Sequence, residues 1–263
     1  MITTGMPRTC GVWLIGLLIF AAARTDAAEQ SRGWGSSWTV PHSAEEKESR
    51  DLDQQMHAAL RAQDWPKVTR LLEESEKLSP NSLPLAYATA VIAMKRQHYA
   101  DAVSAFSHML TLPAARKSAR ITSQIYSERA YAESLGGAYA NSRADFERAI
   151  AADRTNDQAQ NNYAWLLATC PQTQVRDGQR ALSFARALNG KLDGRNPGVL
   201  DTLAAAQAEA GDLASAIKTQ QRALSAAPKD KLATYQHHLV SYQHGQPLRE
   251  APTAPAIKIN PDF

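Results

Sequence analysis

The chain has 263 residues, with 29 Lys and Arg against 26 Asp and Glu and a formal net charge of +3. This length allows one buried core or one elongated array. Because the charge is nearly balanced and no long run of one sign occurs, the composition gives no support to nucleic-acid binding or to attraction toward an anionic membrane surface.

The N-terminus has the pattern of a secretory signal. Residues 1–10 carry one charge, Arg8, and the apolar run GVWLIGLLIFAAA follows at 11–23. Thr25 and Ala27 then suit a cleavage after Ala27. The alternative is an uncleaved anchor, but this run is shorter than the roughly 20 residues that a spanning helix needs. We therefore predict a signal peptide over 1–27 and an exported protein, in the bacterial periplasm or secreted, with no membrane span after cleavage.

Cleavage would leave Cys170 as the single cysteine of the mature chain. A lone cysteine cannot form an internal disulfide. Stability must then come from packing alone, which a stacked helical array can provide.

Residues 28–48 are expected to form a linker, because the stretch up to residue 43 is rich in Gly, Ser and Pro and has no periodicity. From Ser49 onward, a two-helix pattern recurs about every 34 residues. Its clearest copy has Gly211 at the turn, Ala216 and Ala223 at small positions of the second helix, and Pro228 at the end. This spacing is typical of the tetratricopeptide repeat. It predicts repeats at about 49–82, 83–116, 123–156, 157–190 and 197–230.

Two irregularities interrupt this frame. Residues 117–122 break the strict period, and the turn of the fourth repeat is enlarged to TCPQTQVRDGQ, where Asp177 is expected to cap the next helix. After the fifth repeat, 231–244 is predicted to be a capping helix, with Leu232, Tyr235 and Leu239 facing inward. Residues 246–263 contain four prolines and are expected to form an irregular tail.

The chain resembles bacterial tetratricopeptide-repeat proteins. The resemblance is carried most strongly by NNYAWLLATCP, RDGQRAL, PGVLDTLAAAQAEAGD, QQRAL and GQPLRE in the second half. It implies an all-α fold: a right-handed superhelical solenoid of about five helix pairs plus a C-terminal capping helix. It also implies binding of a protein or peptide in a concave groove, without catalysis. The scaffold itself does not specify the partner.

In this family the groove is lined by positions 2, 5, 9 and 12 of each first helix, which share one helical face. Aromatic side chains there suit a binding hot spot, and an Asn amide can both donate to and accept from a peptide backbone. The alternative is that Tyr131 and Trp165 are packing residues. The basic partners of a carboxylate clamp are missing beside Asn161 and Asn162. The predicted partner-binding residues are Tyr87, Val91, Tyr131, Asn161, Asn162, Trp165 and Asp201.

No residue pattern points to catalysis, a metal or a cofactor. Cys170 has no histidine near it in sequence, which favours a structural role. His237, His238 and His244 lack the usual i, i+4 spacing of helical metal ligands. The sequence therefore favours an exported interaction scaffold. A dedicated inhibitor or immunity protein for one exported enzyme is the alternative, and a cell-wall enzyme is a weaker third, because no catalytic motif supports it. The partner and the oligomeric state stay open.

Overall fold

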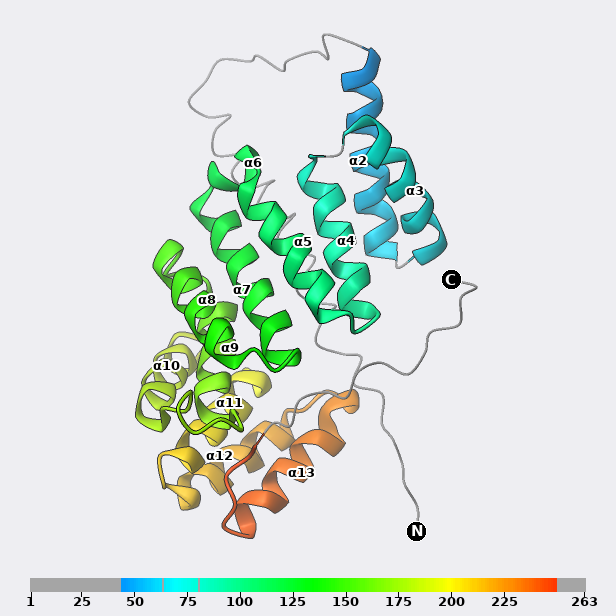
Figure 1. Ribbon diagram of the computed structural model, residues 1–263. Helices are drawn as coiled ribbons and strands as arrows, with labels where there is room; N and C mark the ends of the chain where they lie inside the picture. Colours follow the sequence, from blue (N-terminus) through cyan, green and yellow to red (C-terminus); the bar gives the residue numbers. More distant parts are fainter. Residues whose placement is uncertain (1–43, 63, 80, 250–263) are drawn as a thin grey trace. The chain divides into compact units, whose positions relative to one another are not determined.

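The computed structural model describes residues 44–249 apart from 63 and 80 (Figure 1). The chain divides into two compact units, Met1–Ile121 with Pro255–Phe263, and Thr122–Ala254. The predicted signal peptide, most of the predicted linker and most of the predicted tail lie outside the described residues. Within residues 44–249 the regular secondary structure is helical, and none of these helices is long and apolar enough to cross a membrane.

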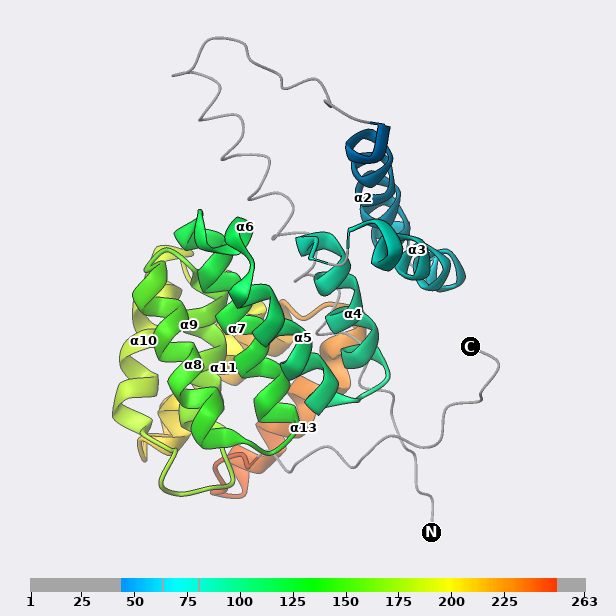
Figure 2. The ribbon, with the colours of Figure 1, turned by 45° about the horizontal axis from the view of Figure 1, so that its top comes forward.

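The first unit is built from two helix pairs, α2 (Ala44–Ala62) with α3 (Trp65–Leu78) and α4 (Leu83–Lys95) with α5 (Tyr99–Thr111). The partners of each pair lie side by side, and α2 also packs on α4 (Figure 2). A one-turn helix, α6 (Pro113–Arg116), follows. Apolar side chains spaced along both helices of the first pair form a buried core with α4: Leu52, Met56, Ala59, Val68, Leu71 and Ala88.

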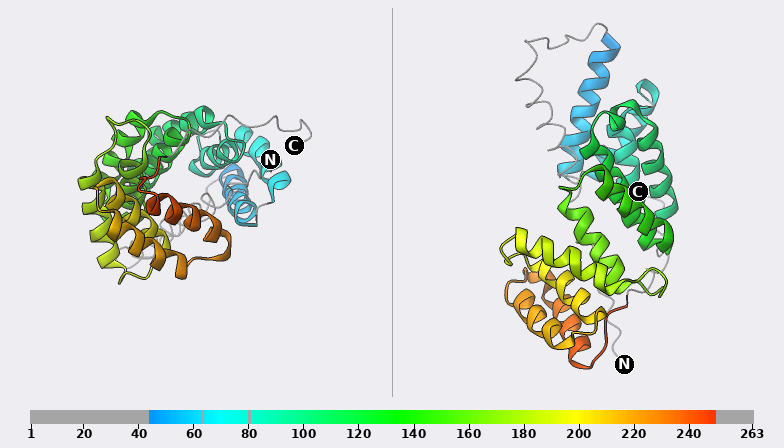
Figure 3. Two further views of the ribbon diagram at one scale, coloured as in Figure 1. Left: turned by 90° about the horizontal axis from the view of Figure 1, so that it is seen from below. Right: turned by 90° about the vertical axis from the view of Figure 1, so that its left-hand side faces the viewer.

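The second unit is also built from paired helices. Helix α7 (Ala119–Leu135) begins just before the division, and α8 (Tyr139–Ala152), α9 (Asp157–Thr169), α10 (Gly178–Lys191), α11 (Pro197–Glu209) and α12 (Leu213–Ser225) follow. Helix α9 packs on both α10 and α11, and α11 packs on α12. After the 3₁₀ turn η1 (Lys229–Lys231), α13 (Leu232–Gln243) lies beside α12 (Figure 3). These contacts confirm the predicted all-α fold of stacked helix pairs.

Two helices begin before the predicted repeat bounds. Helix α2 begins at Ala44, inside the predicted linker, where Glu45 and Glu48 suit the positive end of the helix dipole. Helix α7 begins at Ala119, so the predicted break at 117–122 is partly absorbed as extra helix. In the cap, Tyr235 and Leu239 are buried as predicted, but Leu232 is 43% exposed. Leu232 only starts the helix, and the cluster with Leu200 and Ala223 is made one turn later by Tyr235.

Local sequence signals set where the helices start and stop. Side chains of Ser82, Asn156, Asp177 and Asp212 each accept a hydrogen bond from a backbone N–H of the helix that they precede. This satisfies donors that a helix leaves unpaired at its N-terminus. The predicted cap at Asp177 is thereby confirmed, with a bond of 2.9 Å from the N–H of Arg180.

Small residues bring the paired helices close together. Ala102, Ala181 and Ala216 are fully buried, each near the start of the second helix of its pair. The largest core of the second unit collects side chains from α7 through α11, including Phe146 and Tyr163. Within each unit, one pair thus buries its apolar face against the next, which is the physical basis of repeat folds.

Candidate functional site

The predicted partner-binding residues fall in both units. Tyr87 and Val91 lie on α4 in the first unit, and the other five lie on α7, α9 and α11 in the second. Tyr87 is only 4% exposed and Asp201 only 7%. The rest are half-buried: Val91, Tyr131, Asn161, Asn162 and Trp165. Whether a partner contacts any of these residues stays a prediction.

In the second unit, Tyr131 on α7 and Trp165 on α9 occupy equivalent positions of consecutive repeats. Both rings are half-buried, and Ala130 beside Tyr131 belongs to the same core cluster as Leu166 beside Trp165. The two helices therefore pack into one core and present an aromatic ring at matching places. Asn161 lies one turn before Trp165, and its Oδ1 is buried without a hydrogen-bond partner among the described residues.

Helix α13 covers part of this surface. The rings of Trp165 and His238 have centroids 5.6 Å apart. Nδ1 of His238 lies 2.8 Å from Oδ1 of Asp201, and both side chains are about nine-tenths buried. The capping helix thus contacts two of the predicted partner-binding residues with a single side chain.

Gln220 completes this polar cluster. Its Nε2 donates to Oδ1 of Asp201 at 2.7 Å and to the carbonyl of Tyr235 at 3.2 Å, from a fully buried side chain. A buried carboxylate needs such partners, because removing it from water is costly. Sequence reasoning missed Gln220 and His238 as partners of Asp201. The available signal was a glutamine at a position of α12 whose equivalents are small or apolar.

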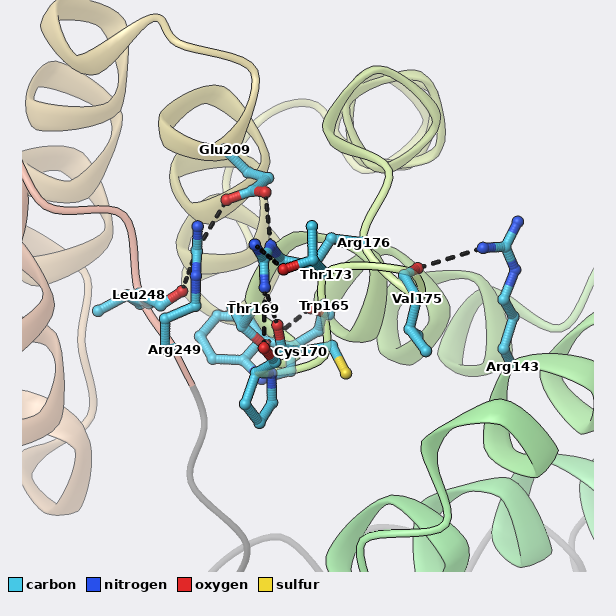
Figure 4. A network of polar contacts seen from close by, with 11 residues as sticks. Arg143, Trp165, Thr169, Cys170, Thr173, Val175, Arg176, Glu209, Leu248 and Arg249 are labelled. Carbon is cyan, nitrogen blue, oxygen red and sulfur yellow. Dashed lines mark hydrogen bonds and ion pairs between the residues drawn. The ribbon is translucent and has the colours of Figure 1, made fainter.

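The enlarged turn between α9 and α10 is rigidly bonded rather than open. Nη1 of Arg176 donates to the carbonyls of Cys170 and Pro171, at 2.8 and 3.1 Å, and its Nε lies 2.8 Å from Oε1 of Glu209 (Figure 4). Val175 is buried, and its carbonyl accepts from Arg143. The Cys170 side chain is only 1% exposed. Through these contacts the enlarged turn is part of the packing of the second unit. Its residues Gln172, Thr173 and Gln174 are exposed.

Two other features bear on possible sites in the described residues. An open surface hollow of about 320 Å³ in the first unit is lined by side chains of α2 and Lys67 of α3, all polar except Ala58. Among residues 44–249, no three His, Cys, Asp or Glu side chains gather as metal ligands would. Neither feature supplies the geometry of a catalytic site.

Comparison with solved structures finds chains that resemble this one. The crystal structure of the P58(IPK) TPR domain, at 2.5 Å, matches this chain with 13% sequence identity and a TM-score of 0.33. The match covers 89% of this chain and 77% of that one. No family model matches the chain. No curated protein matches it either. The assignment of tetratricopeptide-like helix pairs therefore rests on the helix lengths, turns and packing within each unit.

Proposed function

We propose that this protein is an exported, non-catalytic scaffold that binds a protein or peptide partner through the first helices of its repeats. The observation that carries the proposal is the matched pair of half-buried aromatic rings, Tyr131 and Trp165, on consecutive first helices of one core. Aromatic anchors on a rigid support are the side chains that most often dominate binding energy. The signal-like N-terminus supports export.

Asn161 and Asn162 add polar specificity to this surface. Both are half-buried on α9, within one turn of Trp165. An amide that offers a donor and an acceptor can bind the backbone of an extended peptide without requiring a charge on it. The partner is therefore expected to contribute an extended, largely uncharged segment with at least one apolar side chain against the rings.

A capture experiment tests this placement. The mature chain, starting at Ala28, would be cross-linked in an extract of the cell envelope and its partners identified by mass spectrometry. The same is done with Tyr131→Ala/Trp165→Ala, checked for helicity by circular dichroism. The control is Gln172→Ala/Gln174→Ala, which removes two exposed side chains of the enlarged turn. A partner kept by the control and lost by the aromatic variant supports the proposed surface.

Equal capture by both variants would overturn the placement on these first helices. Trp165 also packs on His238, so the aromatic variant removes a contact within the protein as well. A second variant, Asn161→Asp/Asn162→Asp, therefore leaves both rings in place, keeps side-chain shape and adds negative charge. If one exported enzyme is recovered with very high affinity and its activity is blocked, the protein is the dedicated inhibitor rather than a general scaffold.

A further inference from the structure

The chain reverses direction after the capping helix. Gly245 has φ +76°, a left-handed conformation that favours glycine, and the N–H of Gln246 donates to the carbonyl of Ser241 at 3.0 Å. This helix end directs Gln246–Arg249 back across the second unit instead of away from it. We call Gly245–Arg249 the C-terminal strap.

Leu248 anchors the strap to core clusters of the second unit that include residues of α11. It packs against one core cluster that contains Ala205 and Ala206 and against another that contains Ala204, Ala208 and Tyr242. In the repeat frame, Ala205 and Ala208 stand at positions 9 and 12 of the first helix, where the resemblance places the groove. Both are almost fully buried, at 1% and 2% exposure. The apolar part of the strap therefore lies on a surface predicted to receive a partner.

Arg249 adds an ionic anchor at the end of the same helix. Its Nη1 lies 2.7 Å from Oε2 of Glu209, while Oε1 of Glu209 binds Arg176 of the enlarged turn (Figure 4). Glu209 is the last residue of α11, where the helix dipole disfavours negative charge, and its side chain is only 13% exposed. Two guanidinium groups compensate a carboxylate that would otherwise be costly at this place.

We propose that the C-terminal strap is an intramolecular ligand of α11 that holds the enlarged turn closed. Through Glu209, the strap is coupled to Arg176, and through Arg176 to the carbonyls of Cys170 and Pro171. Release of the strap frees the surface of α11 and loosens the turn together. A partner that binds this end of the first-helix surface must therefore displace a Leu-Arg segment of the protein itself.

The test uses the mature full-length chain and needs no partner. Leu248→Asp removes the apolar anchor, and Arg249→Glu reverses the ionic one. Hydrogen exchange is measured at the second half of α11 and at residues 170–177. In parallel, the rate at which an alkylating reagent labels Cys170 is followed by peptide mass spectrometry. We expect labelling at least about tenfold faster in both variants, with exchange faster at these two segments and unchanged in α8.

Two controls separate the strap from general effects of charge or stability. Arg195→Glu makes the same charge change at an exposed residue and should leave the labelling rate as in the wild type. Arg249→Lys can keep one ionic contact with Glu209 and should restore slow labelling. Wild-type rates in Leu248→Asp and Arg249→Glu would overturn the proposal. So would an equal loss of protection throughout α8–α12, because the strap would then only contribute to overall stability.

Discussion

Gln97 adopts a backbone conformation that is unfavourable for its side chain. It lies in the turn between α4 and α5 with φ +60°, where the equivalent turns of the second unit have Gly137 at +81° and Gly211 at +91°. A residue with a Cβ atom in this left-handed region costs roughly 1–2 kcal/mol. The turn between α4 and α5 therefore carries a backbone strain that the turns at Gly137 and Gly211 avoid.

We expect Gln97→Gly to stabilise the protein. Relief of the strain should exceed the extra chain entropy of glycine, for a net gain of about 0.5 kcal/mol in the free energy of unfolding. Thermal unfolding followed by circular dichroism measures the change. The reverse substitution, Gly211→Ala, should cost about 1 kcal/mol, because no atom lies within 4 Å of the added Cβ and only the backbone angle opposes it. A loss of stability in Gln97→Gly would contradict this explanation.

Glu133 on α7 is a buried carboxyl whose ionisation opposes folding. Burial and the charge of Asp145 raise the pKa of Glu133 to about 7, against the lowering effect of Arg129 and Arg148. Asp145 is itself paired with Arg129, with Nη2 to Oδ1 at 3.0 Å, so these guanidinium groups only partly compensate Glu133. Its Oε2 has no hydrogen-bond partner among the described residues.

Stability should therefore fall as pH rises through this carboxyl's titration. The folded protein keeps the proton up to about pH 7, whereas the unfolded chain loses it near the model value of 4.5. Between these two values the folded state binds more protons, so raising the pH favours unfolding. In Glu133→Gln this part of the pH dependence should disappear. The measurement is the midpoint of urea unfolding from pH 4.5 to 7.5 in both proteins. Parallel curves would show that Glu133 does not titrate in this range.

The start of α10 and the end of α11 lie close together at Gly178. A Cβ atom built there would lie 2.9 Å from three backbone atoms, the nitrogen of Ala210 and the carbonyl carbon and oxygen of Glu209. Backbone atoms cannot move aside as a flexible side chain can. The first residue of α10 must therefore be glycine if the enlarged turn is to meet the end of α11.

Gly178→Ala should separate these two helices and destabilise the protein by about 1–3 kcal/mol, the usual cost of overpacking. Gly190→Ala is the matched control on the same helix, because nothing lies within 4 Å of its added Cβ. It should be neutral or stabilise by up to about 1 kcal/mol through helix propensity. Chemical denaturation of both variants gives the comparison. Equal effects would mean that the close approach at Gly178 does not limit packing.

Across the whole molecule, stability comes from repeated local pairs rather than from one central core. In the first unit α2 packs on α4, in the second α9 packs on α11, and α13 of the second unit buries Tyr235 and Tyr242. Cys170, the cysteine among the described residues, forms no disulfide, so none adds to the packing there. A repeat protein of this kind depends on the packing of each helix pair on the next.

The proposed export can be tested on the whole chain. Expressed with its N-terminus intact in a bacterial host, the protein should be recovered from the envelope or medium with Ala28 as its first residue. Removal of residues 2–27 should leave it in the cytoplasm, because the apolar run that targeting requires would be missing. Mass spectrometry of the intact protein in each fraction shows where the protein is found and whether residues 1–27 have been removed. A recovered chain that retains residues 1–27 would favour an uncleaved anchor.

The sequence determined the local structure of this protein. Periodic apolar and small residues predicted the helix pairs, Asp177 was correctly predicted as a cap, and Ala216 and Ala223, predicted as small positions of the second helix, are buried. These features depend on neighbours within one or two turns or one repeat, so a linear pattern reports them. The same pattern predicted the candidate binding residues only as positions on a helical face.

Only the tertiary structure decided which of those positions the chain itself covers. Asp201 meets His238, which is 37 residues away, and Glu209 joins Arg176 to Arg249 across three segments. Such pairings depend on the register in which repeats stack and on the angle at which α13 and the C-terminal strap return. Because a one-residue change of register turns a side chain by about 100°, the linear pattern does not determine them.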